Sequence, residues 1–146
     1  MKTIKVALVG QPNVGKSALI NSVGNARLKV GNFSGVTVKK EMVRFSRDGY
    51  DFEITDLPGS YSLTDYTIEE RVTKHYLEDS DYDLILNVVD STNIERNLYL
   101  TTELLALNKK TVVALNMTDE AVKEGVHIDE RQLSKILGVP CVKTSA

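Results

Sequence analysis

The sequence has few of the residues that mark secreted, membrane-spanning or fibrous proteins. It contains no tryptophan, and cysteine occurs once among its 146 residues, at Cys141. A single cysteine excludes an intramolecular disulfide, and the apolar neighbours of Cys141 predict a buried, unreactive thiol. No apolar run approaches the roughly 20 residues that a membrane-spanning helix needs, and no signal-like apolar segment follows Met1. These absences predict a chain that is soluble as given and that belongs in a reducing compartment.

Neither sign of charge is in large excess. The formal net charge is −2, from 18 Lys and Arg against 20 Asp and Glu. Such a balance gives no overall attraction to polyanions, so no nucleic-acid partner is expected. The length suits one domain, which we predict to span residues 1–146.

The most informative stretch that is present follows the first apolar run. It has the pattern Gly, four variable residues, Gly-Lys-Ser, which is typical of a phosphate-binding P-loop between a strand and a helix. Its backbone N–H groups are expected to surround phosphate oxygens, while the lysine adds a point charge and the serine hydroxyl reaches a nucleotide-bound Mg²⁺. The predicted nucleotide-binding residues here are Gly10, Gln11, Pro12, Asn13, Val14, Gly15, Lys16 and Ser17.

Apolar runs of strand length alternate with helical patterns along the rest of the chain. This alternation predicts an α/β fold with a mostly parallel six-stranded sheet, one antiparallel strand from an early hairpin, and helices on both faces. Asp48-Gly49 marks the hairpin turn. The expected strands are residues 4–9, 42–47, 50–55, 84–89, 111–115 and 140–142.

Between the first helix and the hairpin, residues 26–37 show no periodicity. Gly31, Asn32, Ser34 and Gly35 interrupt any regular pattern, so we predict a long loop that acts as a mobile switch. Helix starts are predicted further along the chain, with Thr67, Asn93 and Asp129 as amino-terminal caps.

Two further motifs follow strands of the predicted sheet. Asp56-Leu57-Pro58-Gly59 is a common turn sequence, but after a P-loop it predicts that Asp56 holds Mg²⁺ through water and that the Gly59 N–H contacts a γ-phosphate. The segment Asn116–Asp119 predicts recognition of the nucleotide base. The Asp119 carboxylate can accept both the N1–H and the 2-amino hydrogens of guanine, a pair of donors that adenine lacks, so GTP is expected over ATP.

These motifs, with Thr37 in the switch loop and Thr144-Ser145-Ala146 after the last strand, resemble in their order the P-loop GTPase fold. The backbone N–H groups of residues 144–146 are expected to reach the guanine O6. More specifically, the chain resembles the amino-terminal G domain of the FeoB family of prokaryotic ferrous iron transporters. The stretches that carry this resemblance are residues 35–38, 56–63, 96–101 and 114–119, and Met117 stands where most GTPases have lysine.

The resemblance implies a GTPase module on the cytoplasmic side of the membrane, followed in the full protein by a helical spacer and a membrane region that moves Fe²⁺. It leaves self-association open. It also implies a closing helix, so we expect a chain truncated inside its last guanine motif. His75, His127 and Cys141 are isolated in the sequence, so no iron-ligand cluster is predicted.

The resemblance also implies roles in hydrolysis. Lys16 and Mg²⁺, the latter held by Ser17, Thr37 and Asp56, are expected to neutralise phosphate charge, and Val36 flanks Thr37 at the nucleotide. Ser60 stands where Ras-like enzymes place a water-orienting glutamine and is too short for that task, so intrinsic hydrolysis should be slow. The resemblance implies that a potassium ion activates hydrolysis in place of the missing glutamine and that Asn13 helps to bind this K⁺. Alternatively, Asn13 is an ordinary loop asparagine whose side chain hydrogen-bonds its own backbone.

Two alternatives to a GTPase that serves iron transport stay open at this point. One is a regulatory module that senses guanine nucleotide with negligible turnover. The other is a soluble ribosome-assembly GTPase of the Era type, which shares the asparagine in the P-loop. Met117 and the slightly acidic balance argue against the second alternative.

Overall fold

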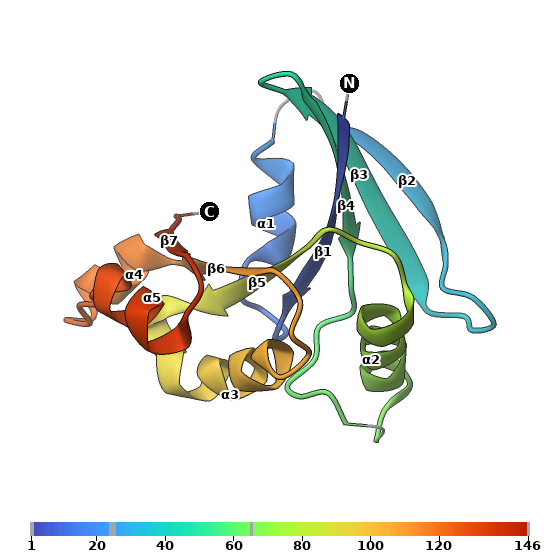
Figure 1. The fold of residues 1–146 in the computed structure, drawn as a ribbon. Helices are drawn as coiled ribbons and strands as arrows, with labels where there is room; N and C mark the ends of the chain where they lie inside the picture. The colour runs from blue at the N-terminus through green and yellow to red at the C-terminus, as the bar shows by residue number, and fades with distance from the viewer. Residues whose placement is uncertain (1, 24–25, 65, 146) are drawn as a thin grey trace.

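A seven-stranded mixed sheet forms the centre of the protein (Figure 1). The computed structural model describes residues 2–23, 26–64 and 66–145. The strand order across the sheet is β2-β3-β4-β1-β5-β6-β7. The strands are β1 (Lys2–Gly10), β2 (Arg27–Asn32), β3 (Lys39–Arg47), β4 (Tyr50–Asp56), β5 (Leu84–Asp90), β6 (Thr111–Asn116) and β7 (Cys141–Lys143).

The central strand β1 is parallel to both of its neighbours. Leu8 lies opposite Asp56 of β4, and Gly10 lies opposite Val88 of β5. Further pairs join β5 to β6 and β6 to β7 in parallel, whereas β3 is antiparallel to both β2 and β4. The predicted sheet with one antiparallel strand is therefore confirmed, and the carboxyl ends of its parallel strands meet along one edge.

Helices cover both faces of this sheet, as predicted. On one face, α1 (Lys16–Asn21) packs on a cluster that includes Val6, Leu8 and Val88. On the other face, α2 (Ile68–Asp79) and α3 (Ile94–Leu105) enclose a cluster around Ala7, Val9 and Ile85, and α5 (Glu130–Leu137) extends this layer over β6. A short helix α4 (Thr118–Lys123) follows β6.

The seventh strand, β2, corrects the sequence prediction of six strands and of a loop over residues 26–37. Residues 27–32 pair with β3, and Leu28 lies opposite the buried Val43. All six residues of β2 are exposed. This edge strand is therefore held by its backbone hydrogen bonds to β3 and not by burial of its side chains. Local periodicity could not reveal a strand of this kind. The remaining loop is short, and it is closed by a hydrogen bond from the Phe33 N–H to the Val38 carbonyl.

Two of the three predicted helix caps are confirmed. The Thr67 side chain accepts a hydrogen bond from the Glu70 N–H, and Asp129 accepts one from the Gln132 N–H. Asn93 does occupy the amino-terminal cap position of α3, but its side chain makes no capping hydrogen bond, and Asp90 caps the 3₁₀ turn over residues 91–93 that precedes α3. The side chain of Asn97 then donates to the Asn93 carbonyl.

The cysteine and histidines form no obvious metal site. Cys141 is half-buried, and its burial, with a smaller contribution from Glu130, raises the pKa of its thiol. Across residues 2–23, 26–64 and 66–145, no three His, Cys, Asp or Glu side chains lie close enough to hold a metal ion. Within the same ranges, no helix combines the length and the apolar character needed to cross a bilayer.

Candidate nucleotide-binding site

The predicted motifs meet at the carboxyl edge of the parallel strands. The P-loop leaves β1, the segment Asp56–Gly59 leaves β4, and Asn116 ends β6. Hydrogen bonds join these segments directly: the Ser60 N–H donates to the Gly10 carbonyl at 3.1 Å, and the Asn116 amide donates to the Val14 carbonyl at 3.0 Å. Motifs far apart in the sequence therefore build one site.

The backbone of the P-loop has the conformation that close contact with an anion requires. Asn13 and Gly15 have positive φ angles of 66° and 87°, which turn the chain sharply into α1. A Cβ atom added at Gly10 would lie 2.7 Å from the Val88 carbonyl oxygen, so only glycine fits there. No side chain of the described residues caps the start of α1 at Gly15. The first N–H groups of α1 thus have no side-chain cap and are available to an anion.

Not every P-loop side chain can face a nucleotide. Gln11 is buried, and its amide donates to the Arg96 carbonyl of α3 at 2.8 Å. Val14 is also buried and packs in the apolar cluster beneath α1. These residues can contact phosphate only through their backbone, and their side chains fix the loop to its surroundings.

Lys16 connects the P-loop to the segment after β4. Its Nζ lies 3.1 Å from Asp56 Oδ1 and donates to the Leu57 carbonyl at 2.6 Å. The two side chains of the ion pair are only 11% and 18% exposed. Burial raises the pKa of Asp56, and Glu41 adds to that rise, whereas Lys16 acts in the opposite direction. The positive charge predicted to face phosphate is thus held in place by two partners.

A cavity of about 380 Å³ opens beside this ion pair. Ser17 and Asp56 both line it, and a hydroxyl and a carboxylate are hard oxygen ligands of the kind that Mg²⁺ prefers. The residues present therefore fit a magnesium ion. The cavity is lined by Pro12, Lys16, Ser17, Val38, Lys39, Glu41, Asp56, Leu57, Pro58 and Gly59.

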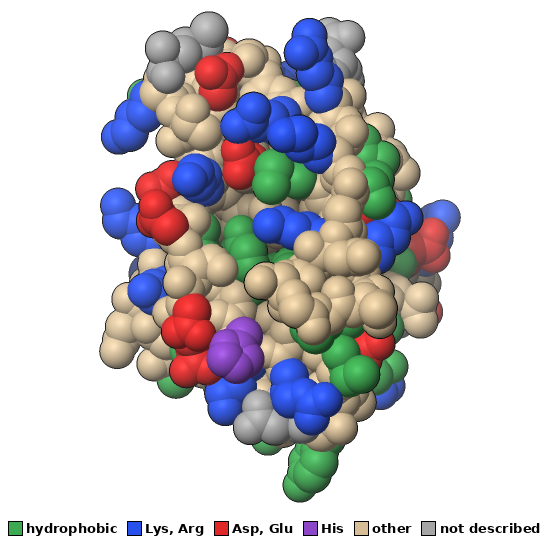
Figure 2. All heavy atoms as spheres, turned by 90° about the vertical axis from the view of Figure 1, so that its right-hand side faces the viewer, with side chains coloured by type: hydrophobic (Ala, Val, Ile, Leu, Met, Phe, Trp, Pro, Cys, Tyr) green, Lys and Arg blue, Asp and Glu red, His purple; other side chains and the backbone are tan. Residues whose placement is uncertain are grey.

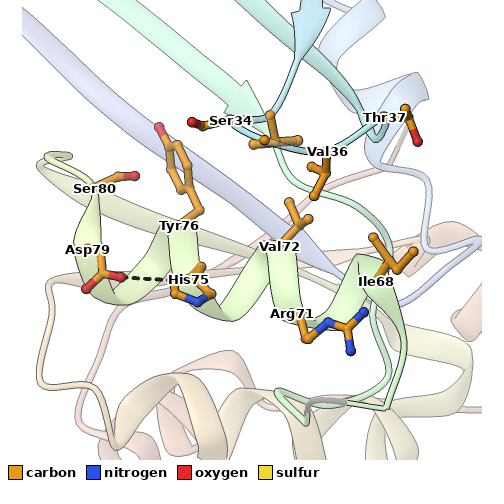
Figure 3. A pocket seen from close by; sticks show the side chains of 12 residues that line it. Ser34, Val36, Thr37, Ile68, Arg71, Val72, His75, Tyr76, Asp79 and Ser80 are labelled. Carbon is orange, nitrogen blue, oxygen red and sulfur yellow. Dashed lines mark hydrogen bonds and ion pairs between the residues drawn. The ribbon is translucent and has the colours of Figure 1, made fainter.

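The predicted switch residues Val36 and Thr37 lie elsewhere. They line a separate groove between residues 33–37 and α2, and they do not line the cavity that holds Lys16 and Asp56. Figure 3 shows the Thr37 side chain at the end of this groove. In this conformation Thr37, which was predicted to hold Mg²⁺ with Ser17 and Asp56, does not line the cavity that those two residues line.

The segment after Asp56 packs tightly on the P-loop. A Cβ atom at Gly59 would lie 3.1 Å from Pro12 Cα, so the two loops are in close contact. The Ser60 side chain is 2% exposed, and its hydroxyl lies 3.3 Å from Thr73 Oγ1 of α2 and donates to the Pro58 carbonyl. Ser60 thus anchors this segment to α2. The sequence did not predict the role of Thr73. Its position relative to the apolar residues of α2 indicates only that it lies on the inner side of the helix, and not that it contacts Ser60.

On the base side of the site, Asn116 is fully buried and ties elements together. Its Oδ1 accepts a hydrogen bond from Thr144 Oγ1 at 2.9 Å, in addition to its own bond to the P-loop. The Thr144 N–H donates to the Leu115 carbonyl, so this one of the three N–H groups predicted to reach a guanine O6 is already paired, and for Ser145 and Ala146 the prediction stays a prediction. Ser145 is exposed and hydrogen-bonds Thr118, and Ala146 lies outside the described residues.

The remaining residues predicted to recognise the base lie at the start of α4. Met117 is half-buried with a positive φ of 60°, which turns the chain from β6 into the helix. Asp119 follows in the first turn of α4 and is exposed. The fold thus leaves the Asp119 carboxylate accessible at the edge of the site.

The raised pKa of Asp56 predicts a pH-dependent contribution to stability. Between its ordinary value of 3.8 and the higher folded value, the folded state binds more protons than the unfolded state. The free energy of unfolding therefore falls as pH rises through that window. We expect wild type to lose stability relative to Asp56→Asn as pH rises above the ordinary Asp56 pKa of 3.8, measured by urea titrations at a series of pH values. A constant difference between the two proteins would contradict the pKa direction.

Four features define the class of protein: the mostly parallel sheet, the P-loop, the Lys16–Asp56 pair and the segment Asn116–Asp119. This is a G domain with the P-loop GTPase fold. A family model described as ferrous iron transport protein B matches residues 4–146. The chain therefore belongs to the FeoB family, and the Era-type alternative is set aside.

Curated relatives and solved structures agree with this assignment. The Fe(2+) transporters FeoB of Helicobacter pylori and Campylobacter jejuni are 62% and 56% identical over the whole chain, which spans 23% and 24% of their lengths. The crystal structure of the G domain of the T. maritima FeoB iron transporter has a TM-score of 0.90 at 44% identity, covering 98% of this chain and 87% of that one. The T. maritima cytosolic domain in a GMPPNP form has a TM-score of 0.93 at 45% identity, covering 97% of this chain and 56% of that one.

Proposed function

We propose that residues 1–146 bind and hydrolyse GTP as the cytosolic domain of a Fe²⁺ transport protein, and that the nucleotide state is coupled to iron uptake through the segments around Thr37 and Gly59. The observation that carries this proposal is the position of Lys16, which contacts both Asp56 and the Leu57 carbonyl at the mouth of the P-loop. The chain spans about a quarter of the curated FeoB relatives, so a helical spacer and a membrane region are the partners proposed for it in the whole protein.

The chemistry follows from charge. Lys16 and the N–H groups at the start of α1 stabilise negative charge on the β- and γ-phosphates, and the Gly59 N–H binds the γ-phosphate. Ser17 and Asp56 would hold Mg²⁺, with Thr37 as a third proposed ligand after movement of residues 33–37, and the ion would neutralise phosphate charge. The Thr37 carbonyl then orients the attacking water. Ser60 takes no part in orienting that water, because its hydroxyl is buried against Thr73 and Pro58.

Asn13 supports a role for potassium. Its side chain is exposed at the P-loop and makes no hydrogen bond to any residue that the structure describes, so its carbonyl oxygen is available to a cation. We expect GTP turnover to be several-fold faster in K⁺ than in Na⁺, and we expect Asn13→Ala to remove that difference while GDP affinity stays the same. Phosphate release measured in matched K⁺ and Na⁺ buffers tests this, and equal rates in the two salts would exclude the potassium site.

The second candidate function is a nucleotide sensor with negligible turnover. The buried Ser60 favours it, because its hydroxyl contacts Thr73 and the Pro58 carbonyl and is not placed to orient water. Single-turnover cleavage of GTP, compared with the rate at which GTP dissociates, separates the two functions. Release of intact GTP before cleavage would favour the sensor, whereas cleavage before release supports the GTPase.

The contact between Thr73 and Pro58 makes a separate prediction. Thr73 Oγ1 lies 3.4 Å from the Pro58 carbonyl and so helps to fix the peptide that precedes Gly59. Thr73→Val removes this hydroxyl and should weaken binding of a GTP analogue about fivefold relative to GDP, which corresponds to about 1 kcal/mol for one neutral hydrogen bond. Thr73→Ser keeps the hydroxyl and should keep the ratio of the two affinities. An unchanged ratio in Thr73→Val would show that Thr73 does not position Gly59.

A further inference from the structure

The segment that joins β4 to α2 is held by α3 as well as by α2. Residues 57–64 have no helix or strand of their own, and they pass beside α3 on their way to α2 (Figure 1). Gly59 lies in this segment and lines the cavity that Lys16 and Asp56 also line. Contacts that hold the neighbours of Gly59 in place therefore also set the position of the Gly59 N–H.

Arg96 on α3 contacts both the P-loop and this segment. Its carbonyl oxygen accepts the hydrogen bond from the Gln11 amide at 2.8 Å, and its guanidinium carbon lies 4.8 Å from the centre of the Tyr61 ring. The cation and the ring are therefore close enough for a cation–π contact. Ser60, which precedes Tyr61, donates its N–H to the Gly10 carbonyl. Together these contacts close a triangle between the P-loop, α3 and the segment.

Glu103 holds the same segment further along α3. Its Oε2 accepts a hydrogen bond from the Leu63 N–H at 3.2 Å. Arg96 and Glu103 are about two helical turns apart, so both side chains leave α3 on nearly the same side. The Leu63 side chain packs against the apolar cluster that contains Leu100 and Leu104 of α3. Helix α3 thus contacts the segment at two positions with side chains of opposite charge.

The other carboxylate oxygen of Glu103 argues against a purely stabilising role. Oε1 is buried and has no hydrogen-bond partner in the part of the chain that the structure describes. A buried acceptor without a donor costs free energy, and the cost is larger for a charged group. An apolar residue at this position would avoid the cost but could not bind the Leu63 N–H. The carboxylate is therefore better explained by the position that it gives to Leu63.

We propose that Arg96 and Glu103 are positioning residues that act together as a clamp on residues 61–63 and thereby keep the Gly59 N–H at the nucleotide-binding cavity. The clamp rests on the proposed function, in which this N–H binds the γ-phosphate of GTP. GDP has no γ-phosphate, so its binding does not depend on the position of Gly59. The clamp therefore favours binding of GTP over binding of GDP.

The first test removes the two contacts separately. Glu103→Leu should lower the affinity for GMPPNP about tenfold relative to GDP, because a hydrogen bond to a carboxylate is lost. Arg96→Gln should lower it about threefold, because one cation–π contact is lost. Glu103→Gln keeps an acceptor and Arg96→Lys keeps a positive charge, so each should restore most of the ratio. Titrations with fluorescent GDP and GMPPNP measure the two affinities.

A second readout separates positioning from a local loss of contact. Neither substitution touches the Ser60 N–H, whose hydrogen bond to the Gly10 carbonyl lies directly beside Gly59. Release of the clamp should make amide hydrogen exchange at Ser60 about fivefold faster in the nucleotide-free protein, in Glu103→Leu and in Arg96→Gln. Wild-type exchange at Ser60, or a wild-type ratio of affinities, in both variants would overturn the clamp. A wild-type protein that binds GDP but not GMPPNP would contradict the proposed function, and exchange at Ser60 would still decide the clamp.

Matched controls lie on β3 and α2, on the side of the protein that Figure 2 shows, where Lys and Arg side chains stand beside Asp and Glu. Arg47 at the end of β3 and Glu78 on α2 are both exposed. Arg47→Gln and Glu78→Leu make the same chemical changes away from the clamp and should leave the ratio and the exchange unchanged. Urea unfolding checks that each variant is folded. Because Arg96 is exposed, Arg96→Gln keeps the test available if Glu103→Leu does not fold.

Discussion

Asp119→Asn is expected to lower the affinity for GDP by about 10⁴-fold and to raise the affinity for XDP. The Asp119 carboxylate accepts two hydrogens from guanine, whereas an asparagine amide presents one acceptor and one donor and leaves a guanine donor unpaired. Xanthine has a carbonyl where guanine has its 2-amino group, so it accepts the hydrogen bond that the new amide donates. Titrations with fluorescent GDP and XDP measure both changes.

The fold should tolerate this substitution. Asp119 is exposed in the first turn of α4, and asparagine has nearly the same size. Glu120→Gln, on the neighbouring exposed residue, is the matched control and should leave the affinities for GDP and XDP unchanged. If Asp119→Asn bound GDP within tenfold of wild type, Asp119 would not be the residue that recognises the base.

Lys16→Met should slow single-turnover GTP hydrolysis by about 10²–10³-fold, the range found when one group that stabilises the transition state is removed. Methionine keeps most of the length of the side chain but cannot offset charge on the phosphates. It also removes the cation that opposes the rise in the Asp56 pKa, so Asp56 should titrate at a still higher pH. Rapid-quench hydrolysis and NMR titration of the Asp56 carboxyl measure the two effects.

Lys16→Arg separates charge from shape. Arginine keeps the positive charge, but its planar fork cannot repeat the contact of one Nζ with both Asp56 Oδ1 and the Leu57 carbonyl. We therefore expect a rate between those of Lys16→Met and wild type. A Lys16→Met protein that hydrolyses GTP within threefold of wild type would remove Lys16 from the mechanism.

The sequence predicted those parts of the protein in which the signal is local. The P-loop, the turn at Asp48-Gly49 and the cap at Thr67 each depend on a few adjacent residues, and the structure has all three. Strand β2 could not be predicted in this way, because its stability comes from pairing with β3 and its side chains are exposed on both faces.

The residue types in the sequence indicated which residues belong to the site, but they did not indicate all of the hydrogen-bond partners of those residues. Asn116 was predicted to recognise the base, and the structure shows it buried between the P-loop and Thr144. The sequence showed only that Ser60 is too short to orient the attacking water. Its contact with Thr73 joins the segment after β4 to α2, and the sequence did not predict it. Contacts of this kind depend on how elements pack, and no spacing within one segment encodes them.

The buried amide of Asn116 has a consequence for how nucleotide leaves. The amide nitrogen holds the P-loop at the Val14 carbonyl, and the amide oxygen holds Thr144, which directly follows β7. Release of the base before the phosphates would disturb the buried Asn116 amide, whose hydrogen bonds to Val14 and Thr144 could not be replaced by water. The two halves of the ligand are therefore mechanically linked, and dissociation should proceed as a single concerted opening and not as a sequence of independent releases.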